Sequence, residues 1–309
     1  MIDLTIKLGI IVVYLVDDDN EKLLDIHLNQ IKKNTSSQFI LYACVNMLQP
    51  KFVNKLKRYR FVKPVVCEDY VGPNDETRGA KEHSHYLTQL IKIAIKDGAS
   101  HIAIFHPDSF PINLGWDQKY LNQLVYDTDL ISIFPHMTGF MFFHKNFYSI
   151  NNPSLLPSLE DETSQSWLKF QKTNHVTNLS ESGMGFAYNA YLNRQNWIKL
   201  NKSTFGDHDY SFGSFTNNYI FHLGSASDYK NRPMRDIASH QKNMGIKDFI
   251  SKILPNSIKN IFKKMISQEI LFPEIKENKD EFIKTRNMLL NDTSNFLKSL
   301  KTGKIKNEA

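Results

Sequence analysis

Cysteine is scarce in this sequence of 309 residues, and no hydrophobic run is long enough to cross a bilayer. The two cysteines, Cys44 and Cys67, form no CxxC pair and lie in apolar segments. That pattern predicts buried free thiols in a reducing compartment. The apolar run at 9–16 ends in three aspartates, which is typical of a buried strand and not of a signal peptide. We therefore expect a cytoplasmic protein.

The sequence also lacks a strong excess of charge outside its carboxyl-terminal end. Of 38 basic and 32 acidic residues, 13 basic and 8 acidic ones lie from position 246 onward, which leaves 25 and 24 for the rest. Because this body is nearly neutral, we expect no binding to nucleic acid. The segment 246–270 mixes lysines with apolar residues. It predicts basic amphipathic helices that either touch an anionic membrane surface or pack on the rest of the chain.

No Gly-x-Gly-x-x-Gly motif follows the first predicted strand. This argues against a dehydrogenase or methyltransferase of the Rossmann type, because those glycines let the backbone approach a dinucleotide. The length and the hydrophobic fraction of 41% are nevertheless ample for a globular protein with a full core.

What the sequence does contain is a regular alternation of short apolar runs and amphipathic segments. The pattern predicts a helix at 84–96 that leads into a strand at 101–105, after strands at 7–16, 38–45 and 62–67 and helices at 21–33 and 51–59. Further strands are expected at 129–134, 139–144 and 219–223, and further helices at 114–126, 164–171 and 279–300. This order predicts an α/β fold with a mixed, mostly parallel sheet flanked by helices.

The predicted strand at 101–105 runs into a polar cluster, His-Pro-Asp-Ser-Phe-Pro at 106–111. Proline cannot donate a ladder hydrogen bond, so we expect Pro107 and Pro111 to end the strand. His106 and Asp108 then lie at its carboxyl end, where open α/β sheets bind ligands. An imidazole and a carboxylate two positions apart can share a divalent metal ion.

From the first strand to about position 222, the order of parts resembles the GT-A class of nucleotide-sugar glycosyltransferases. The cluster at 106–111 resembles the Asp-Ser-Asp-Ala-Phe-Pro motif of bacterial surface-polysaccharide (capsule and lipopolysaccharide) transferases. His106 replaces the first aspartate of that motif, and Asp108 matches the second. Residues 180–183 (Ser-Glu-Ser-Gly) resemble a later Asp-Thr-Gly segment, and residues 221–225 (Phe-His-Leu-Gly-Ser) resemble a late His-x-Gly element.

The resemblance implies a GT-A-like catalytic domain at 1–245 and a basic amphipathic helical region at 246–309. It implies transfer of a sugar from a nucleotide-sugar donor to a glycan or lipid-linked acceptor. Asp108, His106 and His222 would bind Mn²⁺ or Mg²⁺, since a divalent cation neutralises the departing diphosphate. If the helices at 246–270 touch lipid, the protein would lie peripherally on the inner face of the membrane.

Polar residues that follow the first strands are candidates for binding the nucleotide. Asp17 and Asp18 follow the first strand and Asn46 follows the second, where their oxygens could accept bonds from the base or ribose. Arg78 is a candidate phosphate ligand, because guanidinium pairs bidentately with phosphate oxygens. His85 could bond the donor sugar or phosphate.

Activation of an acceptor hydroxyl needs a general base within hydrogen-bond reach. Glu181 is the first candidate if the reaction inverts the anomeric centre, and Asp207 and Asp209 are its rivals. The sequence does not decide between inversion and retention.

Two other functions stay open at this point. A His-rich zinc hydrolase could use the cluster and the late histidine together with His83 and His85, although side chains one residue apart at a helix start diverge. The second is a GT-A-like protein that binds a nucleotide or sugar without catalysis, because a histidine stands at the first metal position.

Overall fold

The computed structural model describes residues 7–75, 77–134, 137–176, 182–200, 202–204, 214–216, 219–224 and 273–302. The chain divides into two compact units, Met1–Ser203 with Phe215–His222, and Thr204–Ser214 with Leu223–Ala309. Each unit is described by itself. The predicted boundary at 245/246 and the predicted basic helices at 246–270 lie outside the described residues.

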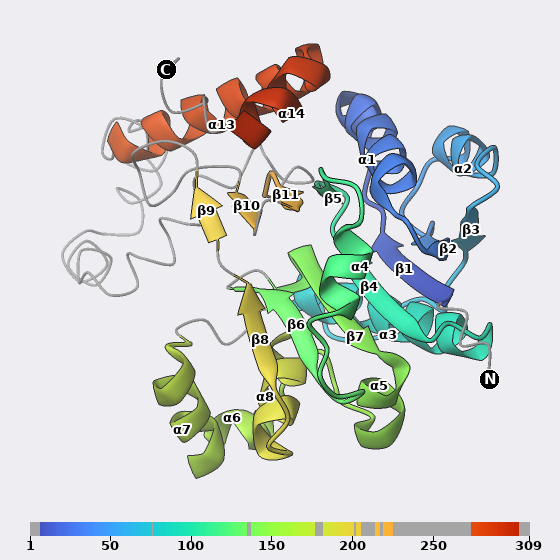
Figure 1. Ribbon diagram of the computed structural model, residues 1–309. Helices are drawn as coiled ribbons and strands as arrows, with labels where there is room; N and C mark the ends of the chain where they lie inside the picture. Colours follow the sequence, from blue (N-terminus) through green and yellow to red (C-terminus); the bar gives the residue numbers. More distant parts are fainter. Residues whose placement is uncertain are drawn as a thin grey trace. The chain divides into compact units, whose positions relative to one another are not determined.

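A seven-stranded sheet forms the centre of the first unit (Figure 1), in the order β3-β2-β1-β4-β7-β6-β8. Neighbouring strands are parallel except where they pair with β7. The expected α/β fold with a mixed, mostly parallel sheet is therefore confirmed. The strands are β1 (Lys7–Val13), β2 (Gln38–Cys44), β3 (Val62–Val65), β4 (His101–Phe105), β6 (Leu130–Ile133), β7 (Phe140–His144) and β8 (Trp197–Leu200).

A smaller sheet has the order β5-β11-β10-β9. Its strands are β5 (Ser109–Pro111), β9 (Lys202–Thr204), β10 (Ser214–Thr216) and β11 (Ile220–His222). The antiparallel pair of β5 and β11 belongs to the first unit. The pair of β5 and β11 lies close to the end of the central strand β4, because only three residues separate β4 from β5.

Helices cover both faces of the large sheet. One core joins α3, α5, α7 and α8 to the first face, and a second core joins α1, α2 and α4 to the other. Along β1, Ile11 belongs to the first core, and Ile10 and Val12 belong to the second. Burial on both faces explains why this strand is apolar at every inner position. The helices are α1 (Glu21–Asn34), α2 (Pro50–Leu56), α3 (Arg78–Lys96), α4 (Trp116–Leu121), α5 (Lys145–Asn151), α6 (Leu159–Thr163), α7 (Gln165–Asn174) and α8 (Met184–Leu192).

The strand order places a topological switch point beside β1. The chain moves outward from β1 to β2 and β3 and then returns to the other side of β1 as β4. Open α/β sheets bind ligands in the crevice at such a point, outside the carboxyl ends of the strands. The residues that follow β1 and β4 lie at this edge.

Helix α3 begins at Arg78, six residues before the predicted start at position 84, so the predicted start is wrong. Asp75 explains the early start. Its carboxylate accepts the backbone N–H of Thr77 at 2.9 Å and pairs with Lys81 at the same distance. Both contacts stabilise the first turn of the helix. As a result His83 and His85 lie inside α3 and not at its first turn.

The predicted helix at 114–126 is much shorter, because α4 spans only Trp116–Leu121. Gly115 precedes it with a φ of 77°, a conformation that favours glycine. Beyond the helix, the Asp129 carboxylate accepts the backbone N–H groups of Val125 and Tyr126, each at 3.0 Å. Those bonds fold the chain into a turn where a longer helix was expected.

Strands β5 and β8 were not predicted. Pro111 was expected only to end a strand, yet it is the last residue of β5. Proline is tolerated there because β5 is the edge of the smaller sheet. The four residues of β8 form the edge of the large sheet beside β6, and their mixed pattern gives no period-2 signal.

In the second unit, the structure describes α13 (Pro273–Asn291) and α14 (Thr293–Thr302). The prediction of one helix over 279–300 is wrong, because the chain breaks at Asp292. The Asp292 carboxylate accepts the backbone N–H of Asn295 at 3.2 Å and so caps a new helix.

Two expectations drawn from composition can be compared with the structure. Cys44 and Cys67 are buried free thiols, as predicted. In the described ranges, every helix is too short or too polar to cross a membrane.

Candidate functional site

The turn that follows β4 carries two of the predicted metal ligands. Phe105 ends the strand, and the backbone N–H of Ser109 donates to the carbonyl oxygen of His106 at 3.0 Å. This bond closes a turn over residues 106–109, with Pro107 at the second position, where its fixed φ is favoured. Asp108 is held buried within this 106–109 turn.

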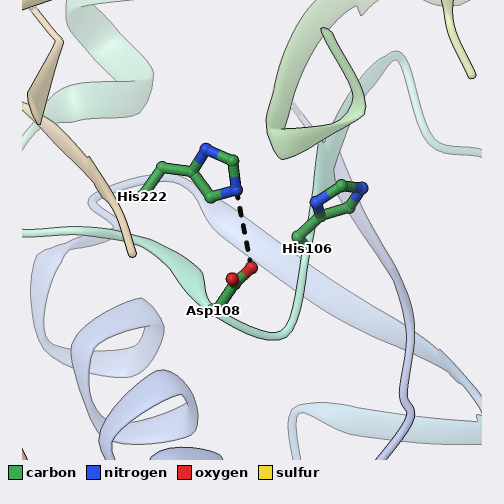
Figure 2. A group of neighbouring side chains, drawn as sticks. All are labelled: His106, Asp108 and His222. Atoms are coloured by element: carbon green, nitrogen blue, oxygen red, sulfur yellow. Dashed lines mark ion pairs between the residues drawn. The ribbon is translucent and has the colours of Figure 1, made fainter. Parts of the chain in front are cut away.

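Strand β11 brings the third predicted ligand to the same place. It runs antiparallel to β5, with Phe221 opposite Phe110 and His222 opposite Ser109. His222 therefore lies beside the turn, and its Nε2 is 3.6 Å from Oδ1 of Asp108 (Figure 2). Strand pairing, and not closeness in sequence, assembles the site.

His106, Asp108 and His222 form a converging group (Figure 2). Each offers one ligand atom, and these atoms lie within 4.8 Å of one another. Metal–ligand bonds of about 2.0–2.2 Å place ligand atoms roughly 3–4.4 Å apart. The three side chains therefore need to move only slightly closer together to coordinate one ion. The residues present therefore fit a divalent cation.

The chemistry of the donor set narrows the choice of cation. Two imidazoles and one carboxylate combine nitrogen ligands, which suit Zn²⁺ and other transition metals, with an oxygen ligand that suits Mn²⁺. Mg²⁺ prefers oxygen ligands alone. Of the two cations that the resemblance implies, Mn²⁺ suits this donor set better.

The segment between β6 and β7 orients both imidazoles. The hydroxyl of Thr138 lies 2.8 Å from Nε2 of His106 and forms a hydrogen bond with it. A Cβ on Gly139 would lie only 2.9 Å from Cε1 of His222, so the ring occupies the space that a side chain would need. Sequence analysis missed both residues, because no charge or periodicity marks the short η2 helix (Met137–Gly139).

His83 lies next to the converging group. Its ring centroid is 5.2 Å from that of His106, and its Nδ1 is 3.4 Å from Oγ of Ser182. Burial lowers the pKa of His83 to about 3, and His106 acts in the same direction, so the ring is neutral at pH 7. Among the described residues, His83 is not part of the converging ligand group. The side chain of His85 diverges from that of His83, as expected, and contacts the carbonyl oxygen of Glu68.

The start of α8 packs on α3 through the second half of the 180–183 segment. Oγ of Ser182 donates to the carbonyl of Ala80 at 3.3 Å and accepts from the hydroxyl of Ser84 at 3.2 Å. Gly183 has a φ of 101°, and a Cβ there would lie 2.9 Å from Cβ of Met137. A glycine is therefore required at this position.

The three candidate general bases, Glu181, Asp207 and Asp209, lie outside the described residues. The roles of all three stay predictions.

The candidate nucleotide ligands after β1 and β2 have partners within the protein. Oδ1 of Asp17 accepts the backbone N–H of Asn20 at 3.1 Å and caps the short η1 helix (Asp18–Asn20). Asp18 pairs with Lys51 at the surface. The Asn46 side chain accepts from the backbone N–H of Cys67 at 2.8 Å and donates to Asp69. Nucleotide binding by Asp17, Asp18 and Asn46 stays a prediction.

Arg78 and His85 hold the loop that precedes α3. Arg78 donates to the carbonyl of Gly72 at 3.2 Å and lies over the ring of Tyr70. Nε2 of His85 is 2.9 Å from the carbonyl oxygen of Glu68. The structure gives both side chains structural contacts, and their predicted role in donor binding stays a prediction.

Comparison with known proteins finds solved structures of low similarity. No protein-family model matches the chain, and no curated protein matches it. Mouse xyloside xylosyltransferase 1 in its apo form matches 63% of this chain and 86% of its own, with 9% identity and a TM-score of 0.42. A Desulfovibrio desulfuricans G20 structure assigned as a nucleotide-diphospho-sugar transferase matches 62% and 79%, with 13% identity and a TM-score of 0.37. At these scores neither likeness supports a conclusion about the fold or the activity.

Proposed function

We propose that this chain is a metal-dependent glycosyltransferase that moves a sugar from a nucleotide-sugar donor to a glycan or lipid-linked acceptor. One observation supports it most. His106, Asp108 and His222 converge at the carboxyl edge of a mostly parallel α/β sheet, beside its topological switch point.

A cation held at this site would suit a reaction that develops negative charge. When the bond between the anomeric carbon and the donor's β-phosphate oxygen breaks, the nucleoside diphosphate leaves as an anion. A divalent cation bound at the site would supply the positive charge that neutralises it. Asp108, buried beside His222, would hold the cation with its carboxylate, and the two imidazoles would complete the protein ligands.

The donor nucleotide would lie over the ends of β1 and β2. These strands pair in register from Lys7 and Gln38 to Val13 and Cys44, so the residues after them lie side by side. We propose that Asp17, Asp18 and Asn46 contact the base or ribose there. Arg78 and His85, on the helix that packs beside β1, would contact the phosphates or the sugar.

For the acceptor we propose Glu181 as the general base, with Asp207 and Asp209 as alternatives. The base would take the proton of the acceptor hydroxyl while its oxygen bonds to the anomeric carbon. The motif at 106–111 favours a growing bacterial surface polysaccharide as the acceptor. The basic segment 246–270 would then place the chain at the membrane, where lipid-linked acceptors lie.

The test is release of nucleoside diphosphate from a panel of UDP- and GDP-sugars, with and without Mn²⁺. We expect one donor class to react only with Mn²⁺, and Asp108→Asn to lower the rate roughly 100-fold or more. Asp127→Asn is the matched control, because this aspartate lies near a histidine at the opposite end of the sheet. Metal-dependent nucleotide binding without release would favour the non-catalytic GT-A-like protein.

The donor set also favours a second candidate, a zinc hydrolase. Two histidines and a carboxylate are the protein ligands of many catalytic zinc sites. This candidate predicts that zinc stays bound through purification and that no nucleotide-sugar reacts. Release of a nucleoside diphosphate by the metal-loaded wild type would exclude it.

A further inference from the structure

His27 is a fully buried histidine in α1 that the proposed reaction does not use. Its ring packs edge-to-face against Phe105 and Phe110, with centroid distances of 6.5 and 6.4 Å. These two phenylalanines bracket the 106–109 turn. His27 therefore packs against the turn that carries two of the metal ligands.

A second contact ties the same helix to the strand that follows the turn. Asn34, the last residue of α1, donates from Nδ2 to the carbonyl oxygen of Pro111 at 2.8 Å. Pro111 ends β5, whose first residue belongs to the 106–109 turn. Helix α1 thus supports the turn and the strand together.

The contact between Tyr14 and His27 decides which ring nitrogen carries the proton. Oη of Tyr14 and Nδ1 of His27 are 2.8 Å apart. Burial raises the pKa of Tyr14 and lowers that of His27 to about 4, so both groups are neutral at pH 7. Among the described residues, the acceptor within reach of the Tyr14 hydroxyl is Nδ1 of His27. The hydroxyl therefore donates, and the imidazole proton lies on Nε2.

The Nε2–H group is consequently a buried donor that makes no hydrogen bond of good geometry among the described residues. A buried donor without a partner costs free energy and calls for an explanation. The groups that raise the pKa of His27 against the effect of burial are the Asp108 carboxylate and the backbone oxygens of Ser109 and His106. All three belong to the 106–109 turn, and the ring also packs against Phe105 and Phe110 on either side of it, so the imidazole of His27 lies beside the turn.

We propose that His27 is a positioning residue of the metal site. It donates from Nε2 to a backbone carbonyl of the 106–109 turn when the three ligands close around a cation, and Tyr14 selects the tautomer that permits this. The inference rests on the proposed function, because it takes the turn as the metal-binding segment. Outer groups of this kind commonly change metal affinity by roughly 10–100-fold.

The first test is the affinity of the full-length protein for Mn²⁺, measured from the EPR signal of the free ion. His27→Phe keeps an aromatic ring and removes both nitrogens. We expect it to raise the Kd about tenfold. His101→Phe is the matched control, because it makes the same change in a histidine at the opposite end of β4. An unchanged Kd in His27→Phe would overturn the inference.

His27→Gln separates hydrogen bonding from packing. The glutamine amide can supply an N–H near the position of Nε2. We expect its Kd to return to within about threefold of the wild-type value, even if its melting temperature falls. A loss of affinity as large as that of His27→Phe would show that His27 acts only by packing.

Two measurements decide the matter if the His27 variants do not fold. The ¹⁵N shifts of the wild-type imidazole report the tautomer, and a proton on Nδ1 would overturn the inference. Tyr14→Phe leaves the His27 imidazole in place but removes the hydroxyl that selects the tautomer of that imidazole. We expect a weaker affinity for Mn²⁺, by about threefold, and an unchanged Kd would count against the role of Tyr14.

Failure of the proposed function would look different. A wild type that binds no Mn²⁺ contradicts the function, while the contact between His27 and the turn can still be measured. Hydrogen exchange of the Ser109 amide in His27→Phe then decides. Faster exchange in His27→Phe would support the role of His27 in positioning the 106–109 turn. Unchanged exchange would overturn that role, in addition to the proposed function.

Discussion

Strand β4 carries a histidine and aspartate cluster at each of its ends, and only one of the two resembles a ligand site. At the carboxyl end are His106, His222 and Asp108. At the amino end are His101, His144 and Asp127. In both clusters one histidine lies 3.6 Å from the carboxylate. The residue types and this distance are the same, so neither explains the difference.

Burial of the carboxylate is the first difference. The Asp108 side chain is 5% exposed, whereas that of Asp127 is 66% exposed. A carboxylate withheld from water is costly unless a positive charge compensates it, so Asp108 gains much from a cation. Asp127 is already hydrated and gains little.

The direction of the ring nitrogens is the second difference. At the amino end, Nδ1 of His144 accepts the backbone N–H of Asn146 and caps α5. Nδ1 of His101 is 3.1 Å from the hydroxyl of Ser100, and its ring stacks on Phe142. These contacts turn the nitrogens toward structural partners. Convergence and a buried carboxylate, and not composition, therefore distinguish a candidate site.

The largest expected effect concerns the two aspartates. Asp108→Ala should weaken Mn²⁺ binding by roughly 100-fold or more, because it removes the buried charge that compensates the cation. Asp127→Ala should leave the Kd unchanged. The EPR titration measures both, and equal affinities in the two variants would remove the basis of the comparison.

Next in size is the effect of the histidines. His222→Ala should raise the Kd for Mn²⁺ about 10–100-fold, because it removes a ligand and leaves its buried partner Asp108 in place. His144→Ala, the equivalent change at the amino end, should alter stability and not Mn²⁺ binding. The same titration, combined with thermal unfolding, checks both expectations. Loss of binding in His144→Ala would show that the two ends are coupled.

We expect the amino-end cluster to make the free energy of unfolding depend on pH. Burial, with help from His144, lowers the pKa of His101 from 6.5 to about 4. Between these values the unfolded chain binds more protons, so the free energy of unfolding falls as the pH drops from about 6.5 to 4. His101 keeps part of its surface in water, so we expect it to contribute about 2 kcal/mol. Urea unfolding of wild type and His101→Phe at pH 7 and 4.5 measures this, and parallel pH profiles would contradict it.

The smallest expected effect compares two glycines. Gly139→Ala should raise the Kd for Mn²⁺ about three- to tenfold, because the new Cβ displaces the His222 ring. Gly9→Ala is the matched control near the amino end of β1, where a Cβ would lie 3.1 Å from Cβ of Ala94. It should cost about 1–2 kcal/mol of stability and leave Mn²⁺ binding unchanged. Titration and urea unfolding separate the two outcomes.

Much of this fold could be predicted from periodicity. The strands and helices from β1 to β4 were predicted with their order, since apolar runs such as that of β1 are buried on both faces. The errors arose where one side chain decides a boundary. Asp75 starts α3 early, Asp129 ends the α4 region, and Asp292 divides the last helix. Bonds of this kind have no period in the sequence.

The candidate site was predictable only in part for a similar reason. His106 and Asp108 could be found because they follow a strand that ends in proline, and His222 because a late motif marked it. Thr138, Gly139 and His27 could not, because their roles depend on contacts between segments far apart in the chain. Those contacts exist only once β7 and α1 have packed around β4.

The most direct test of the central claim is a calorimetric titration of UDP and of GDP into wild type and Asp108→Ala, with and without Mn²⁺. We predict that one nucleotide binds the wild type only when Mn²⁺ is present and does not bind Asp108→Ala. Binding of equal strength with and without Mn²⁺, in both proteins, would contradict a metal-dependent nucleotide-sugar site at His106, Asp108 and His222.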